Sequence, residues 1–256
     1  MQAHEHPSVG QATAPSGWLA GPPDYVGVGT ARSGTSWWDQ LINRHPAVVR
    51  APGAPKELHF FDGLWERGLQ AGDIERYHAH FSRPAGGICG EWTPGYMLHA
   101  WAPALLRQAA PDARLLVLLR DPVERFRSGR TLAENRFTVG STARAAANAA
   151  FNRGLYADQL LRLWQAFPRH QVFVLQYEQC VADPGAQLER TYAFIGLEPR
   201  IPEGIDLRQR VNASPGSKVA LSAWQTEQLA RHYALENERL AGLVPELDLS
   251  LWRRPR

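Results

Sequence analysis

The sequence predicts one α/β domain in which helices flank a mainly parallel central sheet. Apolar runs suited to buried strands alternate along the chain with stretches whose apolar residues recur with helical period. The run at 114–119 is apolar without interruption after its first residue, as in a parallel strand covered on both faces. Neither an internal repeat nor a Ser/Gly-rich linker divides the body of the chain. Together these three observations favour a single sheet covered on both faces.

The elements can be placed in order along the chain. Residues 1–23 are polar and rich in Gly and Pro, which predicts a disordered tail ahead of a domain at 24–256. A first strand is expected at 25–29, followed by a glycine-containing turn and a helix that ends at His45-Pro46. The other expected strands are a short strand or strand edge at 58–61, and strands at 88–92, 114–120 and 171–177. Helices are expected at 98–110, from 121 onward, at 143–167 with a break near 152–154, at 183–194 and at 221–243.

The composition is that of an ordinary globular protein, and it limits the classes of function. Of the 256 residues 44% are hydrophobic and the net charge is only +3, which excludes a wholly disordered chain and is not typical of nucleic-acid binding. No run of about 20 apolar residues predicts a membrane span. The first residues carry no secretory signal pattern, and Cys89 and Cys180 have neither a zinc spacing nor the number for a disulfide framework. We therefore expect a cytoplasmic protein.

A glycine-containing loop follows the first expected strand. The segment from Gly29 to Ser36 has the spacing of a P-loop, G-x-x-x-x-G-K-S/T, whose backbone N–H groups cradle phosphate. Position 35 is Thr instead of the motif lysine, and the strand at 114–119 ends in Arg120, although Asp121 follows. A nucleoside triphosphatase needs that lysine and an acidic residue for magnesium. The loop therefore suits an anion bound without magnesium, and a tight turn without a ligand is the alternative.

A second segment, from Arg120 to Ser128, begins where the most apolar strand ends. Open α/β sheets bind ligands at the carboxyl ends of their strands. Ser128 lies about two helical turns beyond Arg120, so the two can share one face of the expected helix. An arginine with a hydroxyl can hold a second phosphate through charge-assisted hydrogen bonds. The alternative is a salt bridge that only caps the helix.

Together these segments resemble the sulfotransferase superfamily. The pair GTARSGTSWW and RDPVERFRS is similar to the 5′-phosphosulfate loop and the 3′-phosphate motif that bind 3′-phosphoadenosine 5′-phosphosulfate (PAPS). The segment from Lys56 to Asp62 resembles the K-E-x-H-F-F-D segment of the heparan-sulfate-type branch, and Gly90 to Tyr96 resembles its E-K-S/T-P-x-Y segment. The C-terminal part resembles the end of many bacterial members, so the likeness covers nearly residues 25–252.

The resemblance implies a P-loop-like sulfotransferase fold and an enzyme that moves the sulfuryl group of PAPS to a hydroxyl. The acceptor would be a sugar or a small natural product, and 3′-phosphoadenosine 5′-phosphate (PAP) would be the second product. No metal, nucleic acid or membrane is implied, and the oligomeric state is open. The donor-binding candidates are Ala31, Arg32, Ser33, Gly34, Thr35 and Ser36 at the 5′ end, and Arg120, Ser128 and Lys218 elsewhere.

Sulfuryl transfer resembles phosphoryl transfer, in which positioning and electrostatic stabilisation do most of the work. The resembling segment places the general base at Glu57, and a solvated pair with Lys56 is the alternative. Arg32 is the candidate that neutralises the leaving phosphate; Lys56 either assists it or only orients Glu57. His59 either contacts the acceptor, orients the base, or is a satisfied and partly buried histidine.

Two positions depart from the family's pattern. The loop usually carries Lys where this chain has Arg32, which can still bind a phosphosulfate bidentately. Trp92 replaces the lysine of the E-K-S/T-P-x-Y segment and supplies no charge, so we expect it to shape the acceptor pocket. Tyr96, Phe137 and Phe151 are further aromatic candidates for holding an acceptor.

Two other functions remain open at this point. A P-loop kinase of a small metabolite would bind ATP with magnesium, and Thr35 at the lysine position argues against it. A nucleotide-binding module without turnover would keep its function after Glu57→Gln, whereas an enzyme would lose turnover and still bind the nucleotide.

Overall fold

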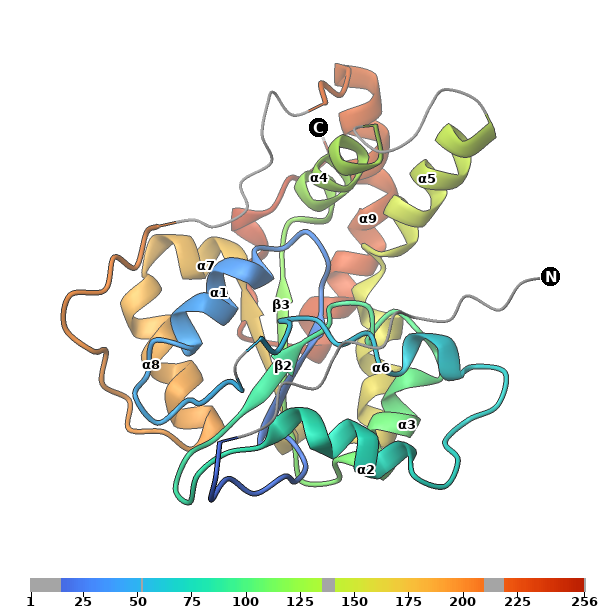
Figure 1. Ribbon diagram of the computed structural model, residues 1–256. Helices are drawn as coiled ribbons and strands as arrows, with labels where there is room; N and C mark the ends of the chain where they lie inside the picture. The colour runs from blue at the N-terminus through green and yellow to red at the C-terminus, as the bar shows by residue number, and fades with distance from the viewer. Residues whose placement is uncertain (1–14, 52, 135–140, 210–218, 256) are drawn as a thin grey trace.

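Four parallel strands form the sheet at the centre of the protein (Figure 1). The computed structural model describes residues 15–51, 53–134, 141–209 and 219–255. The strands are β1 (Tyr25–Gly29), β2 (Gly90–Trp92), β3 (Arg114–Leu119) and β4 (Val172–Gln176), in the order β2-β1-β3-β4. The expected α/β class with a parallel sheet is confirmed.

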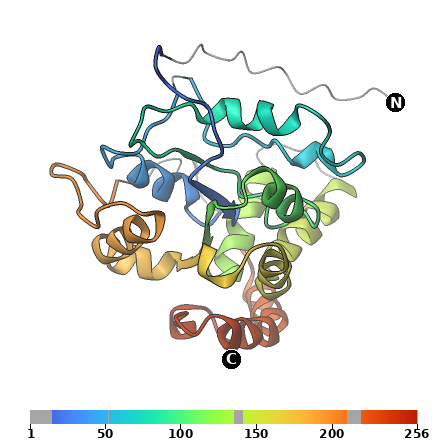
Figure 2. The same cartoon turned by 90° about the horizontal axis from the view of Figure 1, so that it is seen from below.

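Helices cover both faces of this sheet, as Figure 2 shows. The side chains of β3 alternate between the two layers because successive residues of a strand point to opposite faces. Leu116 and Leu118 join the core under α1 (Thr35–Ile42), α7 (Tyr177–Ala182) and α8 (Pro184–Ile195). Leu115 and Val117 join the core with α2 (Asp73–His78), α3 (Ala102–Ala109), α6 (Tyr156–Ala166) and α9 (Ala223–Leu243).

The other helices are α4 (Pro122–Glu134) and α5 (Ser141–Asn152), and the short 3-10 turns are η1 (Asp62–Leu64), η2 (Ala79–Phe81), η3 (Arg169–Gln171) and η4 (Leu249–Leu251).

A tryptophan of β2 packs directly on the backbone of β1. The Trp92 side chain is fully buried, and its Nε1 donates to the carbonyl of Gly29 at 3.1 Å. A Cβ at Gly27 would lie 2.0 Å from the Trp92 ring, so only glycine leaves room for it. The expectation that Trp92 shapes an acceptor pocket is wrong, because this ring fills the core between β1 and the helices over it.

Most of the expected elements are present with small shifts at their ends. The predicted strand at 171–177 and helix at 183–194 correspond to β4 and α8. The expected break near 152–154 separates α5 from α6, and a Cβ at Gly154 would lie 2.6 Å from the Tyr233 hydroxyl. The helix predicted at 221–243 is α9, whose capping box pairs Ser222 with Gln225.

The strand expected at 58–61 is wrong. Leu58 to Phe61 form an irregular segment, and the backbone of His59 lies in the left-handed region at φ 52°. The three amides from Leu58 to Phe60 donate to side chains of β2 and of the turn that follows it, instead of joining the sheet. Apolar residues in this run therefore reflect packing of a loop, which periodicity does not separate from a strand.

Three further expectations concern the N-terminal tail, the two cysteines and membrane-spanning segments. In the predicted tail, Leu19 forms an antiparallel bridge with Arg83, and residues 1–14 lie outside the described part of the chain. Cys89 and Cys180 are both buried free thiols. Within the described residues, no helix has the length and apolar character needed to cross a membrane.

Candidate active site

The loop between β1 and α1 is tied to the neighbouring strand. Thr30 donates from its backbone amide and its hydroxyl to the carbonyl of Leu118, at 3.1 and 3.0 Å, and its hydroxyl lies 2.6 Å from that of Ser33. Arg32 and Gly34 both have positive φ, of 72° and 92°. A Cβ at Gly34 would lie 2.7 Å from the Tyr177 ring, so space and backbone conformation both require glycine there.

This loop delivers the N-terminus of α1 to the carboxyl edge of the sheet. The first helical residues are Thr35 and Ser36, and no acidic residue occupies the first turn. The first backbone N–H groups of a helix have no partner inside the helix and carry its positive dipole end. The loop and the helix start therefore have the geometry of a site suited to an anion.

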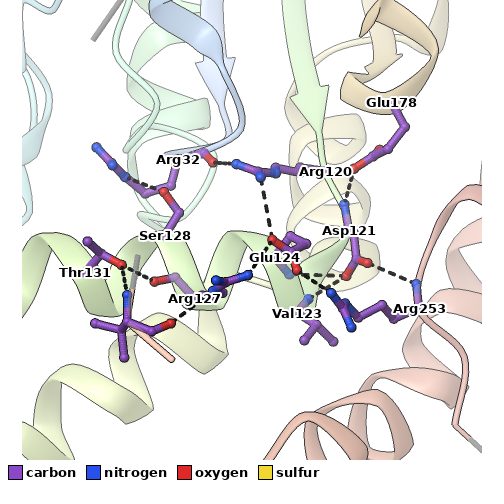
Figure 3. Close-up of polar contacts among 11 residues, drawn as sticks. Arg32, Arg120, Asp121, Val123, Glu124, Arg127, Ser128, Thr131, Glu178 and Arg253 are labelled. Carbon is purple, nitrogen blue, oxygen red and sulfur yellow. Dashed lines mark hydrogen bonds and ion pairs between the residues drawn. The ribbon is translucent and has the colours of Figure 1, made fainter. Parts of the chain in front are cut away.

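Arg120 and Ser128, from the second predicted phosphate segment, lie against this loop (Figure 3). Arg32 donates from Nε to Oγ of Ser128, on α4, at 3.1 Å. Arg120, at the end of β3, donates from Nη1 to the carbonyl oxygen of Arg32 at 3.3 Å. The structure thus brings the two predicted phosphate segments into direct contact. The guanidinium groups of Arg32 and Arg120 and the hydroxyl of Ser128 make this contact.

The Arg120 guanidinium is held in place more by stacking than by ion pairing. It lies over the Tyr177 ring, 4.8 Å from the ring centre, and its nearest carboxylate oxygen, on Glu124, is 3.9 Å away. Its Nε is buried and has no hydrogen-bond partner among the described residues. A cation beside the loop with an N–H donor that has no partner among the described residues is suited to a bound anion. Tyr177 itself was not predicted as a site residue.

Asp121, next to this arginine, serves the backbone. Its Oδ1 accepts hydrogen bonds from the amides of Val123 and Glu124, and its Oδ2 accepts one from Arg253 (Figure 3). Burial raises the pKa of this carboxyl above its ordinary value. The carboxylate therefore caps α4 and fastens the C-terminal segment, which accounts for the acidic residue that follows the buried strand.

A second cluster approaches the loop from residues 56–62. Lys56 Nζ donates to the hydroxyl of Thr35 at 3.2 Å and to Oε1 of Glu57 at 2.8 Å. The other oxygen of Glu57, Oε2, lies 3.2 Å from Nε2 of His59. One ammonium group thus joins the candidate anion loop to the candidate base. The side chains of Glu57 and His59 are 36% and 46% exposed, so this cluster is open to a substrate.

His59 is in turn oriented by an aspartate. Its Nδ1 lies 2.8 Å from Oδ2 of Asp62, whose Oδ1 lies 3.2 Å from Nδ1 of His99. Burial alone would raise the pKa of Asp62, but its contacts with His99 and His59 hold that pKa below its ordinary value. The Trp101 ring stacks on His99 at 4.9 Å between centres. Because Asp62 ends the K-E-x-H-F-F-D segment, the sequence held a signal for it, but His99 had none.

The structure therefore brings together most of the predicted site residues. The loop from Ala31 to Ser36 meets Arg120 and Ser128 on one side and Lys56 on the other. Lys218 and Phe137 lie outside the described residues. Tyr96 is fully buried in the core, so it is not available to an acceptor in the way the sequence predicted. Phe151 is partly buried and stacks on Tyr233, and its role toward an acceptor stays a prediction.

Comparisons with known proteins find relatives among the sulfotransferases. A model of the sulfotransferase family matches residues 89–201. The chain is 32% identical over 188 residues to human heparan sulfate glucosamine 3-O-sulfotransferase 6, covering 69% of this chain and 53% of the relative. It is 28% identical over 247 residues to the human 3-O-sulfotransferase 3B1, covering 91% of this chain and 60% of the relative. The chain thus spans a little over half the length of these relatives.

Solved structures give the same result for the fold. A sulfotransferase from Alicyclobacillus acidocaldarius superposes with a TM-score of 0.72 at 26% identity, covering 91% of this chain and 99% of that one. The sulfotransferase domain of the curacin biosynthetic pathway shares the fold at 13% identity, with a TM-score of 0.56, covering 93% of this chain and all of that domain.

Proposed function

Since the chain belongs to the sulfotransferase superfamily, we propose that it transfers the sulfuryl group of PAPS to a hydroxyl of a carbohydrate or small natural product. One observation carries this proposal furthest. The Lys56 ammonium contacts both Thr35 of the anion loop and Glu57 of the open cluster. A donor anion on the loop and an acceptor hydroxyl at Glu57 would therefore meet beside the same cation.

The donor would be held at its two charged ends. At the 5′ end, the N–H groups of the loop and of the α1 start, with the hydroxyls of Thr35 and Ser36, suit a phosphosulfate. At the 3′ end, Arg120 and Ser128 suit a phosphate, and the unpartnered Nε of Arg120 leaves a donor for it. The bound donor would supply the activated sulfuryl group, with a phosphate as the leaving group.

The residues of the open cluster would prepare the acceptor. Glu57 would accept the proton of the attacking hydroxyl, because its carboxylate is partly exposed next to the loop. His59, oriented through Nδ1 by Asp62, would contact Glu57 through Nε2 and fix the direction of its carboxylate. Lys56 and Arg32 would oppose the negative charge that develops on the leaving phosphate.

The acceptor class follows from the relatives more than from the pocket. Two human relatives are named as sulfotransferases of heparan sulfate glucosamine, which favours a sugar hydroxyl. Because the Trp92 ring is buried between β1 and the helices that cover it, this position has no part in acceptor choice. A saccharide that presents a free hydroxyl to Glu57 is therefore the first acceptor to test.

The donor is tested by calorimetry. Titration with PAP, with and without magnesium, runs beside titration with ATP and magnesium. We expect tight binding of PAP that does not need the metal and is weakened by Arg120→Ala. A preference for ATP with magnesium would overturn the proposal in favour of a small-molecule kinase.

Turnover is tested with radiolabelled PAPS and two acceptors, an N-sulfated heparan oligosaccharide and a simple phenol. We expect Glu57→Gln to lose at least about 100-fold in kcat while PAP binding stays within twofold. Glu189→Gln, an exposed glutamate of α8, is the matched control and should keep full activity. Equal turnover of Glu57→Gln and wild type would exclude Glu57 as the base.

A further inference from the structure

Three successive backbone amides, those of residues 58–60 beside the candidate base Glu57, donate to side chains of a single other segment. Leu58 N–H donates to Oε2 of Glu91 at 3.2 Å, and His59 N–H donates to Oγ1 of Thr93 at 3.2 Å. The next amide, of Phe60, donates to the Tyr96 hydroxyl at 2.9 Å. The acceptors belong to β2 and the turn that follows it. The irregular segment thus has its backbone donors satisfied by side chains instead of by a strand.

These acceptors are themselves buried and linked to one another. Glu91, Thr93 and Tyr96 are at most 1% exposed. The Thr93 hydroxyl donates to Oε2 of Glu91 at 2.5 Å, and Tyr77 donates its hydroxyl to Oε1 at 3.1 Å. A buried network in which every member has partners is rigid, and it fixes the groups that bind to it.

The held conformation is one that the segment would not keep unaided. His59 is not glycine, yet its φ of 52° lies in the left-handed region, which costs on the order of 1 kcal/mol or more for such a residue. This backbone turn places the His59 ring 3.2 Å from the Glu57 carboxylate. If the acceptors were removed, we expect this backbone to leave the left-handed region and the two side chains to move apart.

We propose that Glu91, Thr93 and Tyr96 act as a positioning clamp for the candidate base. The clamp holds the backbone of residues 58–60 so that Glu57 and His59 keep their mutual geometry beside Lys56. Among the described residues, the hydrogen bonds of the three clamp side chains reach residues 58–60, Tyr77 and one another, and none reaches the anion loop or Arg120. The clamp rests on the proposed function, and it assigns to these residues an effect on turnover that is separate from donor binding.

The test compares buried threonines. Thr93→Val keeps the side-chain shape but removes the acceptor for the His59 amide, whereas Thr93→Ser restores a hydroxyl. Thr191→Val is the matched control, because Thr191 is also fully buried and accepts a hydrogen bond from Trp38, on the other side of the sheet. Four quantities are measured for each variant: kcat with labelled PAPS, the Kd for PAP, the midpoint of urea unfolding, and hydrogen exchange of the peptide covering residues 57–60.

For Thr93→Val we expect roughly tenfold faster exchange in that peptide and at least a tenfold lower kcat, with the Kd for PAP within twofold of wild type. Thr93→Ser should recover most of both losses. Thr191→Val should lower the midpoint of urea unfolding without changing the exchange of this peptide or kcat.

Two results would overturn the clamp. One is full kcat in Thr93→Val, and the other is a loss of kcat that Thr191→Val shares at equal loss of stability. Failure of the proposed function is a distinct result, because wild-type protein would then neither bind PAP nor transfer the label. In that case the clamp would have no role in turnover. A wild type that is active beside a Thr93→Val variant that is equally active would overturn the clamp alone.

Discussion

The Arg32 guanidinium donates from Nε to Oγ of Ser128 across 3.1 Å, although the two residues are 96 positions apart in the chain. Arg120 closes the arrangement by donating to the carbonyl oxygen of Arg32. The segment proposed for the 5′ end of the donor and the segment proposed for its 3′ end are therefore one hydrogen-bonded unit. We therefore expect a ligand bound at one end to affect the other end through this contact.

This contact predicts that Arg32 and Ser128 are energetically coupled in binding PAP. Arg32→Lys keeps the charge but loses the Nε–H that reaches Ser128, and Ser128→Ala loses the acceptor. We expect each variant to weaken PAP binding by roughly tenfold, and the double variant to lose less than the product of the two losses. Calorimetry on the four proteins measures the coupling. Losses that add within about 0.5 kcal/mol would show that the two residues act independently.

Arg120 should matter more for PAP than any other stacked arginine. Its buried Nε has no partner in the described part of the chain, so a bound phosphate would gain a charge-assisted bond there. We expect Arg120→Ala to weaken PAP binding by about 10- to 100-fold. Arg169→Ala is the control. Arg169 lies over the Trp164 ring, 4.0 Å from the ring centre, and it precedes β4, so it is at the opposite edge of the parallel sheet from Arg120. Equal effects of the two substitutions would contradict a special role for Arg120.

Gly34→Ala should damage the anion loop without destroying the fold. A Cβ there would lie 2.7 Å from Tyr177, whose ring supports Arg120, and φ is 92°. The variant must shift either the loop or the ring, so PAP binding should fall at least tenfold while cooperative unfolding persists. Gly53→Ala also places a Cβ at positive φ but meets no neighbouring atom, and it serves as the control. Unchanged PAP affinity in Gly34→Ala would show that the loop tolerates the shift.

Much of the fold was predictable because its signals are local. The apolar run of β3 and the helix starts at Pro122 and Pro184 depend on a few neighbouring residues, and each was placed within a residue or two. The segment at 58–61 was not, because its partners Glu91 and Thr93 lie more than 30 positions away. Without those partners, an apolar run of this length is read as a strand.

The site shows the same division. The anion loop and the Arg120 segment carry short motifs, so their residues were found from spacing and resemblance. Tyr177, His99 and the buried position of Trp92 depend on which elements pack together, and no local pattern reports that. We expected Trp92 to shape the acceptor pocket because it stands at the position of a motif lysine and carries no charge. The glycine at position 27, whose Cβ would lie 2.0 Å from the Trp92 ring, is the residue that leaves room for this ring in the core.

Glu91 should make the stability of this protein depend on pH. Burial raises the pKa of this carboxyl from its ordinary 4.5 to about 7. Between those two values the folded protein binds a proton that the unfolded chain has already lost. The free energy of unfolding therefore falls as the pH rises through this window, by at most on the order of 3 kcal/mol from this group.

Glu91→Gln removes this titration and keeps an oxygen that can accept from Leu58 N–H. Relative to wild type, the variant should thus become steadily more stable from pH 5 to pH 8. The measurement is urea unfolding of both proteins at four pH values across that range. The pKa values of Asp121 and Glu178 are also raised by burial, but both proteins contain them, so their titrations cancel in the difference. A difference in unfolding free energy that stays constant with pH would mean that Glu91 titrates alike in the folded and unfolded chain.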